Sequence, residues 1–127
     1  MKKANLLLTG LFFVLSSFSA NAQAKTGADY FVGKWRVLIP GTPLGDLNRF
    51  YIFEKSGETL SGRVQDGTTG AELAKFTKVE VKGDQLTAYY SVNDLDVTVV
   101  FTKKDEDHIT GSVLGAYDAT GERVKTK

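Results

Sequence analysis

The sequence contains no cysteine, one histidine and one tryptophan. Without cysteine the chain has neither disulfides nor thiolate metal ligands, so its stability depends on packing. The histidine, His108, follows an acidic turn made of Asp105, Glu106 and Asp107. A histidine in such a place is typical of a solvated turn, and no spacing of metal ligands or of a nucleophile and its base accompanies it. We therefore expect no enzyme activity, no cofactor and no bound metal.

Long hydrophobic runs are also scarce. The one present spans 6–18; it follows Lys2 and Lys3 and precedes the small-residue site Ala20-Asn21-Ala22. A basic start, an apolar stretch and a small-residue site are together the pattern of a cleaved secretory signal peptide. The run is shorter than the ~20 residues that a membrane-spanning helix needs. We expect 1–22 to be a signal peptide and 23–127 to be a single domain, periplasmic or secreted, with no membrane span after cleavage.

Charge of one sign does not dominate either. The full chain has a formal net charge of +1, and loss of Lys2 and Lys3 with the leader lowers this charge to −1. Binding to nucleic acid or to an anionic membrane surface depends on a basic excess. Neither partner is therefore expected.

What the remaining chain does have is a series of short runs rich in Val, Ile, Phe, Tyr and Thr, separated by Gly, Asp, Asn and Lys. No window holds a 3.6-residue apolar period, so the pattern predicts an all-β fold. A single helical turn is expected at 30–32. In the fourth expected strand the apolar alternation changes parity between Phe76 and Val79, which predicts a β-bulge. The expected strands are 34–39, 49–55, 59–66, 74–82, 85–92, 96–103, 108–116 and 123–126.

An antiparallel up-and-down barrel of about eight strands has alternate connections at opposite ends. The short connections 56–58, 83–84 and 104–107 are expected to close one end. The other connections include the longest and are expected to form an open end, which is where antiparallel barrels hold ligands. These connections are 40–48, 67–73, 93–95 and 117–122. Side-chain alternation places one set of residues inside: Trp35, Val37, Ile39, Leu60, Gly62, Val64, Leu86, Ala88, Tyr90, Val92, Val97, Val99, Phe101, Ile109, Gly111 and Val113.

The segment "FVGKW", which ends at Trp35, resembles the start of the calycin-type barrels: lipocalins, fatty-acid-binding proteins and avidins. The resemblance implies structural roles for Gly33, at the entry to the first strand, and for Trp35, as a plug at the closed end. It also implies a small lipocalin-like domain such as secreted bacterial proteins contain. The chain departs from these families in several respects. Segment 40–48 is too short for the helical lid of fatty-acid-binding proteins, and the tryptophan set of avidins is missing. The last-strand arginine that lipocalins place over the tryptophan is also not expected there, because Arg123 is expected at the open end and only Lys125 or Lys127 could reach Trp35.

Arginine and tyrosine side chains gather at the expected open end, and we predict them as ligand-binding residues: Arg49, Arg63, Tyr90, Tyr117 and Arg123. Charge-assisted hydrogen bonds from an arginine fork suit the carboxylate or sulfate of an amphipathic molecule. Acidic residues are expected at the same end, so a second interpretation stays open, in which the arginines only pair with their neighbours.

The sequence therefore predicts an exported, non-enzymatic binding protein that holds a small apolar or amphipathic molecule at the open end. The alternative is a protein-interaction module, such as an inhibitor barrel that acts on a secreted or periplasmic hydrolase. Small bacterial metalloprotease inhibitors have a similar size and strand number. In that case the open-end loops would contact a protein partner, with the apolar segment 40–47 as the anchor.

Overall fold

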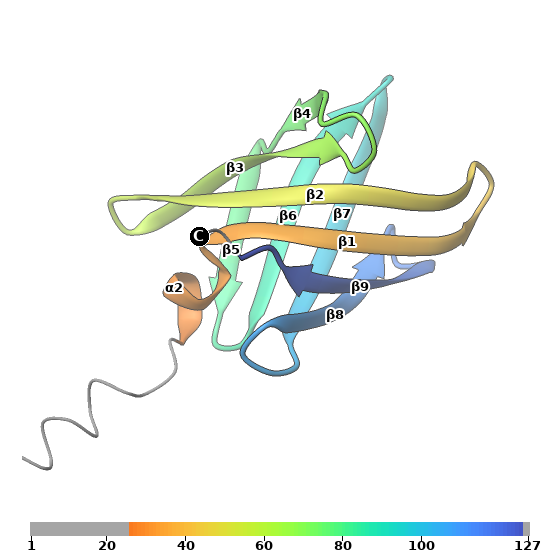
Figure 1. Cartoon of the computed structure of the whole chain (residues 1–127). Coiled ribbons are helices and arrows are strands. Elements are labelled where there is room, and N and C mark those ends of the chain that lie inside the picture. Colours follow the sequence, from red (N-terminus) through yellow and green to blue (C-terminus); the bar gives the residue numbers. More distant parts are fainter. Residues whose placement is uncertain (1–25, 126–127) are drawn as a thin grey trace, which may run out of the picture.

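A computed structural model describes residues 26–125, so the predicted signal peptide lies outside the described residues. Within 26–125, one short helix precedes nine strands, and all these strands belong to one sheet (Figure 1). The elements are α2 (Gly27–Phe31), β1 (Gly33–Thr42), β2 (Gly45–Ser56), β3 (Thr59–Asp66), β4 (Glu72–Lys75), β5 (Lys78–Lys82), β6 (Gln85–Val92), β7 (Leu95–Lys103), β8 (His108–Val113) and β9 (Tyr117–Arg123).

The strands are antiparallel and follow the order β4-β3-β2-β1-β9-β8-β7-β6-β5. Strands that follow one another in the chain are neighbours in the sheet, except where β4 gives way to β5, and β9 returns to pair with β1. The sheet curls over, so that β1, β2 and β3 lie in front of β5, β6 and β7 and cross them steeply in Figure 1. The predicted all-β fold with up-and-down order is confirmed.

The fourth expected strand is two strands, which corrects the sequence-based interpretation. The Phe76 backbone N–H donates to the Gly62 carbonyl of β3 over 3.0 Å, and the Thr77 N–H donates to the Tyr89 carbonyl of β6 over 2.7 Å. The chain therefore leaves β3 and joins β6 between two consecutive residues. The change of parity before Val79 marks this change of partner strand, and the structure has no bulge within a single pair there.

The last strand also differs from the prediction. Strand β8 ends at Val113, and Leu114 and Gly115 have φ values of 58° and 65°, which turn the chain tightly. As a result β9 begins at Tyr117 and ends at Arg123, whereas the last strand is predicted to begin at Arg123. Because the strand starts six residues earlier than expected, its final residue lies at the opposite end of the sheet.

The first hairpin is tighter than expected. The predicted loop 40–48 is mostly strand, because β1 continues to Thr42 and β2 begins at Gly45. Gly41 and Gly45 have φ values of 74° and 92°, a conformation that glycine adopts at little cost. The hairpin therefore turns through Pro43 and Leu44 alone.

The curled sheet has two ends, the helix end and the mouth. The helix end carries α2 and the connections 57–58, 83–84 and 104–107. The mouth, at the opposite end, carries the connections 43–44, 67–71, 93–94 and 114–116. Apart from 67–71, the mouth connections are as short as those of the helix end, so the expected contrast in loop length is weaker than predicted.

The core lies between the two halves of the curled sheet. The predicted inward faces are confirmed by burial, since their large apolar side chains are buried except for Val92, which is half-buried. Strand β2 is apolar on both faces, and it turns Tyr51 and Phe53 inward. Its outward Phe50 packs under the cationic groups of Lys34 and Arg36, 4.1 and 4.6 Å from the ring centre. These contacts explain an aromatic residue on the outer face.

Candidate functional site

A pocket of about 290 Å³ opens at the mouth. Leu44 and Leu95, from two different hairpin turns, form part of its rim, and Leu73 and Val64 contribute to one wall where β4 lies beside β3. The full lining is Leu44, Arg49, Val64, Leu73, Tyr90, Val92, Asn93, Leu95, Val97 and Val113. The walls are apolar, and the polar side chains among them are few.

Arg49 faces the interior of the mouth. Its register partner on β1 is Val37, which is fully buried, and paired residues of neighbouring strands share a face. One guanidinium nitrogen, Nη1, lies 3.9 Å from the Asp66 carboxylate and donates to the Asn48 carbonyl over 3.1 Å. The positive charge in the pocket is therefore already balanced by a neighbouring carboxylate.

Two buried tyrosines meet beneath the mouth. The hydroxyl oxygens of Tyr51 and Tyr90 are 2.6 Å apart, a distance that indicates a hydrogen bond. Burial raises the pKa of Tyr51 well above its usual value and also raises the pKa of Tyr90, so both hydroxyls are protonated at neutral pH. The pair carries two protons and shares one hydrogen bond. With no other described residue bonded to either hydroxyl, one O–H can donate to an acceptor in the pocket.

Asp66 holds both its own loop and Arg49. Its carboxylate accepts hydrogen bonds from the backbone N–H groups of Thr68 at 2.7 Å and Thr69 at 3.1 Å. These two bonds hold the pKa of Asp66 below its usual value, with a smaller contribution from Arg49. The carboxylate is therefore ionised at neutral pH, as the ion pair with Arg49 requires.

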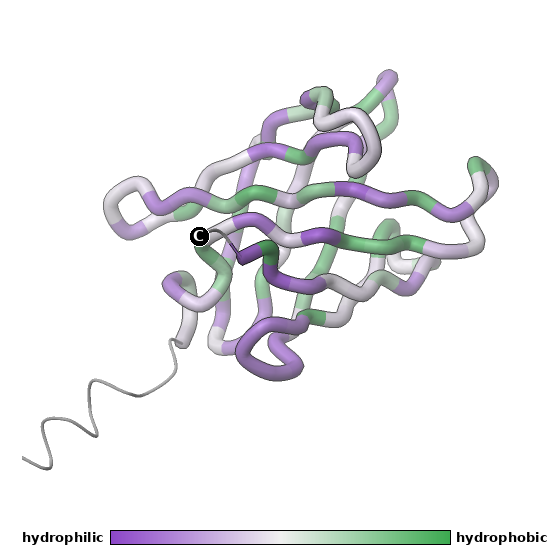
Figure 2. Tube along the Cα trace, in the orientation of Figure 1, coloured by the Kyte–Doolittle hydropathy of each residue, from purple (hydrophilic) through white to green (hydrophobic). Residues whose placement is uncertain are grey.

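The rim of the mouth exposes leucines. Leu44 is 82% exposed, Leu95 is 53% exposed and Leu114 is 42% exposed, and each lies at a different hairpin of this end. Figure 2 shows the hydrophobic tip of the β1–β2 hairpin and, by contrast, the hydrophilic connection 104–107 at the helix end. The mouth therefore exposes apolar side chains to water at three separate hairpins.

Of the predicted ligand-binding residues, the structure brings Arg49 and Tyr90 together in the pocket lining. Tyr117 begins β9 at the mouth and packs against the core, but it does not line the pocket. Arg63 lies on the outer face of β3, next to the buried Val64. Its guanidinium pairs with Glu54 at 3.5 Å and with Glu72 at 3.8 Å, so the prediction that Arg63 lies at the pocket is wrong.

Arg123 lies at the helix end, so its predicted position at the open end is also wrong. It is the register partner of Trp35, and its guanidinium carbon lies 4.3 Å from the centre of the Trp35 ring. Trp35 is fully buried, and its indole N–H donates to the Phe31 carbonyl over 2.9 Å. The arginine over the tryptophan, described above as missing, is thus present. It was missed because the last strand starts earlier than expected.

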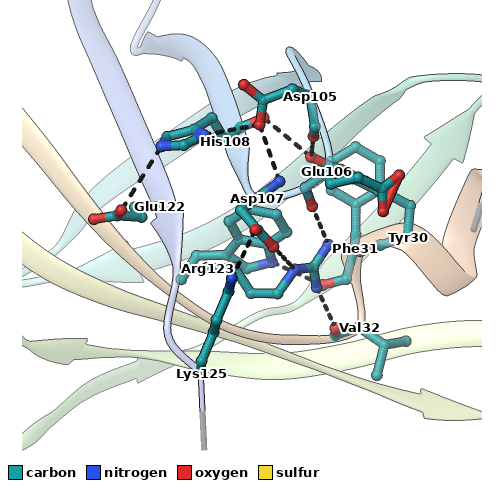
Figure 3. A network of polar contacts seen from close by, with 11 residues as sticks. Tyr30, Phe31, Val32, Asp105, Glu106, Asp107, His108, Glu122, Arg123 and Lys125 are labelled. Atoms are coloured by element: carbon teal, nitrogen blue, oxygen red, sulfur yellow. Dashed lines mark hydrogen bonds and ion pairs between the residues drawn. The ribbon is translucent and has the colours of Figure 1, made fainter. Parts of the chain in front are cut away.

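The Arg123 guanidinium ties three segments of the helix end together (Figure 3). It donates to the backbone carbonyls of Tyr30 at 3.0 Å, Val32 at 3.2 Å and Glu106 at 2.9 Å. Its Nε lies 3.4 Å from the carboxylate of Asp107. This fork of donors closes the helix end with main-chain hydrogen bonds and leaves no role for Arg123 at the mouth.

His108 belongs to the same network. Its Nδ1 lies 2.8 Å from a carboxylate oxygen of Asp105, and its Nε2 lies 3.7 Å from Glu122 (Figure 3). The hydrogen bond with His108, together with one from the Asp107 backbone N–H, lowers the pKa of Asp105. The histidine is therefore placed between carboxylates at the helix end, far along the sheet from the mouth pocket.

Tyr51 is the site residue that sequence reasoning missed, whereas Asp66 is one of the acidic residues expected at the open end, where it pairs with Arg49. Strand β2 reads as apolar on both faces, so periodicity does not assign its inward side. The available signal is Arg49, two residues before Tyr51: once one faces inward, the other does too. Asp66 precedes a glycine and two threonines, a sequence typical of a carboxylate that caps its own turn.

These features define an all-β protein with antiparallel up-and-down strands and a pocket at one end of the sheet. Among solved structures, a redesigned β barrel, mFAP1, solved bound to DFHBI, is similar to this chain with a TM-score of 0.51 and 16% sequence identity. The similarity covers 77% of this chain and 97% of that chain, and at this identity it shows the fold alone. A scan against protein-family models and a search of curated proteins find no match.

The part of the chain that the structure describes contains no helix long and apolar enough to cross a bilayer.

Proposed function

We propose that this chain is an exported, non-enzymatic binding protein of the lipocalin-like barrel type, which holds a small apolar or amphipathic molecule in the mouth pocket. The observation that carries the proposal is the arrangement of that pocket. Arg49 and Tyr90, whose hydroxyl is hydrogen-bonded to that of Tyr51, line it among mostly apolar side chains. Apolar walls with a few polar groups are the usual composition of small-molecule sites.

The volume of the pocket limits the ligand. At about 290 Å³ it is close to the lower end of the ~300–1,000 Å³ range of small-molecule sites. The space below it is filled by aromatic rings, since the ring centres of Tyr51 and Phe101 are 5.1 Å apart and those of Phe53 and Phe76 are also 5.1 Å apart. We infer a compact ligand, or a longer one that leaves part of its body outside the rim.

The similar fold supports a binding role. mFAP1 is a redesigned β barrel that was solved with the small molecule DFHBI bound. A barrel-like sheet of this size can therefore hold a small molecule, and in the present chain the mouth pocket is where we place it. The export of the protein rests on the leader pattern of the sequence.

The proposal can be tested with an uncharged, environment-sensitive fluorescent dye and the chain from Gln23 onward. The dye should brighten on binding at micromolar concentration. Leu95→Ser should weaken binding about fivefold, close to 1 kcal/mol, because Leu95 lines the pocket. Leu38→Ser is the matched control: Leu38 is 49% exposed against 53% for Leu95, but it lies on the outer face of β1.

Two results would overturn the proposal. One is the absence of dye binding up to about millimolar concentration, at which even a weak site with a binding free energy near −4 kcal/mol would be occupied. The other is an equal effect of the two serine substitutions, because the dye would then bind the outer surface of the sheet.

A second candidate function is the interaction module, such as an inhibitor of a secreted or periplasmic hydrolase. The observation that favours it is the exposure of Leu44, which at 82% is far greater than a ligand pocket needs. In this function the β1–β2 hairpin tip inserts into a protein partner. Native mass spectrometry of the protein purified from its own host separates the two, since a bound small molecule supports the first function and a bound protein the second.

A further inference from the structure

The mouth carries charge almost entirely of one sign. Its strand ends and turns are the segments 39–49, 64–73, 90–97 and 112–119, and in these segments Arg49 is the only basic residue. The acidic residues of the same segments are Asp46, Asp66, Glu72, Asp94, Asp96 and Asp118. Basic residues are instead concentrated toward the helix end. The sheet is therefore polarised along its length, and the mouth is strongly acidic.

Two of these six carboxylates are paired with an arginine. Asp66 balances Arg49 at 3.9 Å, and Glu72 is balanced by Arg63 at 3.8 Å from the outer face. Asp96 accepts a hydrogen bond from the Ser91 hydroxyl over 2.6 Å, and this bond orients the carboxylate but leaves its charge. Four carboxylates remain with no ion pair to a described residue: Asp46, Asp94, Asp96 and Asp118.

One of these carboxylates, Asp94, lies in a turn of the mouth, and the alternation of β2, β7 and β9 places the other three on the outer face of the sheet at the same end. Asp94 and Asp96 lie on either side of Leu95 in the chain, and Asp46 follows Leu44 by two residues, so each pocket-lining leucine has an acidic neighbour. Asn93 and Asp94 have φ values of 52° and 66°, which is the backbone of a tight two-residue hairpin turn. Such a turn holds Asp94 at the edge of the pocket. An excess of like charge at one end of the molecule attracts cations to that end and repels anions from it.

We propose that the mouth pocket selects a cationic amphiphile, a small organic molecule with an apolar body and a protonated or quaternary amine. This inference rests on the proposed function and adds the class of ligand. The apolar body lies against Leu73, Val92 and Val97, and the cation stays at the rim beside Asp94, where the carboxylates of the outer face at the same end also attract it. The free O–H of the tyrosine pair donates to an uncharged acceptor at the buried end of the molecule.

An anionic ligand suits the site less well, although Arg49 lines it. Arg49 is already paired with Asp66 and hydrogen-bonded to the Asn48 carbonyl. An anion would have to displace one of these partners and pass the rim carboxylates. In water at ~0.01 M salt, four carboxylates at roughly 10 Å from a ligand cation raise its affinity above that of a neutral molecule by on the order of tenfold. The preference falls to about twofold at ~0.15 M salt, because the screening length is then shorter than the separation.

The test uses three ligands with the same eight-carbon tail: octylammonium, octanol and octanoate. Each displaces the uncharged dye from the chain that begins at Gln23, at low salt and at about 0.5 M salt. Octylammonium should bind on the order of tenfold more tightly than octanol at low salt, and octanoate more weakly than both. The three affinities should converge at high salt.

Paired variants show whether the rim causes the preference. Asp94→Asn combined with Asp96→Asn should bring octylammonium within about threefold of octanol and leave octanol itself unchanged, since roughly half of the rim charge is then gone. Asp84→Asn is the control, because Asp84 occupies a two-residue hairpin turn at the helix end, as Asp94 does at the mouth. It should change none of the affinities.

Two outcomes overturn this inference alone: octanol binds but octanoate matches octylammonium, or the preference for octylammonium survives the asparagine substitutions. If octanol and the dye also fail to bind, the proposed function fails together with it.

Discussion

The guanidinium of Arg123 lies 4.3 Å from the centre of the Trp35 ring, at the point where β9 is paired with β1. The contact joins the last strand of the sheet to the first and covers the buried indole at the helix end. The same guanidinium donates to backbone carbonyls of the α2 region and of the connection before β8. Both chain ends of the described region are thus held by one side chain.

Arg123→Ala should lower the free energy of unfolding by about 1–3 kcal/mol, because three carbonyl acceptors lose their donor. Arg123→Lys should recover only part of the loss, since a lysine has no planar fork to reach three carbonyls and stack on an indole. Urea denaturation measures both. Arg63→Ala is the control, and its ion pairs on the outer surface should contribute less than about 1 kcal/mol. Equal losses for Arg123→Ala and Arg63→Ala would contradict the role given to Arg123.

Trp35→Ala should cost about 3–5 kcal/mol of stability, the usual loss for a large buried aromatic side chain. The indole is fully buried and its N–H is hydrogen-bonded to Phe31, so its fluorescence in the folded wild type should be blue-shifted. A ligand in the mouth pocket lies at the far end of the sheet and should change this emission little. Equilibrium denaturation and emission spectra check these points, and a loss below about 1 kcal/mol would show that the indole does not close the helix end.

Gly111 should not tolerate a side chain. A Cβ at this position would lie 1.8 Å from the Val100 carbonyl oxygen and 3.0 Å from the Phe101 ring, so an added methyl group would overlap the backbone of β7. Gly111→Ala should therefore destabilise the protein by about 1–3 kcal/mol or prevent folding. Ser112→Ala, at the next residue of the same strand, should change stability by less than about 0.5 kcal/mol. Circular dichroism during thermal unfolding compares them, and a Gly111→Ala variant as stable as the wild type would show that β7 and β8 are not so close.

The tyrosine pair should make the protein sensitive to alkali. Burial raises the pKa of Tyr51 and Tyr90, and raises that of Tyr30 to about 12, whereas a tyrosine of the unfolded chain ionises near pH ~10. A raised pKa in the folded state means stability that is fully present below pH ~10 and is lost as the pH rises through the folded values. Urea midpoints measured from about pH 8 to 12 should fall above pH ~10. The double variant Tyr51→Phe, Tyr90→Phe should fall less steeply, and an unchanged slope would contradict the assigned shifts.

Export predicts a shortened chain. Intact-mass measurement of protein from the periplasm or medium of a Gram-negative host should show an N-terminus at Gln23, or at Lys25 if cleavage follows Ala24. Replacing Leu6 and Leu7 by charged residues should block processing, because a signal peptide needs an uncharged apolar stretch. Retention of Met1 in the wild-type protein would refute both the signal peptide and the localisation.

Period-two alternation predicted which side chains enter the core in β1, β3, β6, β7 and β8, but not in β2, which is apolar on both faces. Trp35, Val37 and Ile39 illustrate why: successive side chains of a strand point to opposite faces whatever the strand pairs with. The all-β class and the buried position of Trp35 could be predicted for the same reason. The charge of the mouth was also visible, since the acidic residues of its turns can be read directly.

Other features depend on contacts between residues far apart in the chain, and local patterns do not contain them. Tyr51 and Tyr90 are separated by 39 residues, and only the pairing of the two sheet halves brings their hydroxyls together. The chain is bonded to β3 at Phe76 and to β6 at Thr77, and this change of partner depends on the position of two distant strands, whereas the sequence shows only a change of parity. The end at which Arg123 lies depends on a turn at Leu114, and a shift of six residues in where β9 starts moved this arginine from the mouth to the tryptophan at the opposite end.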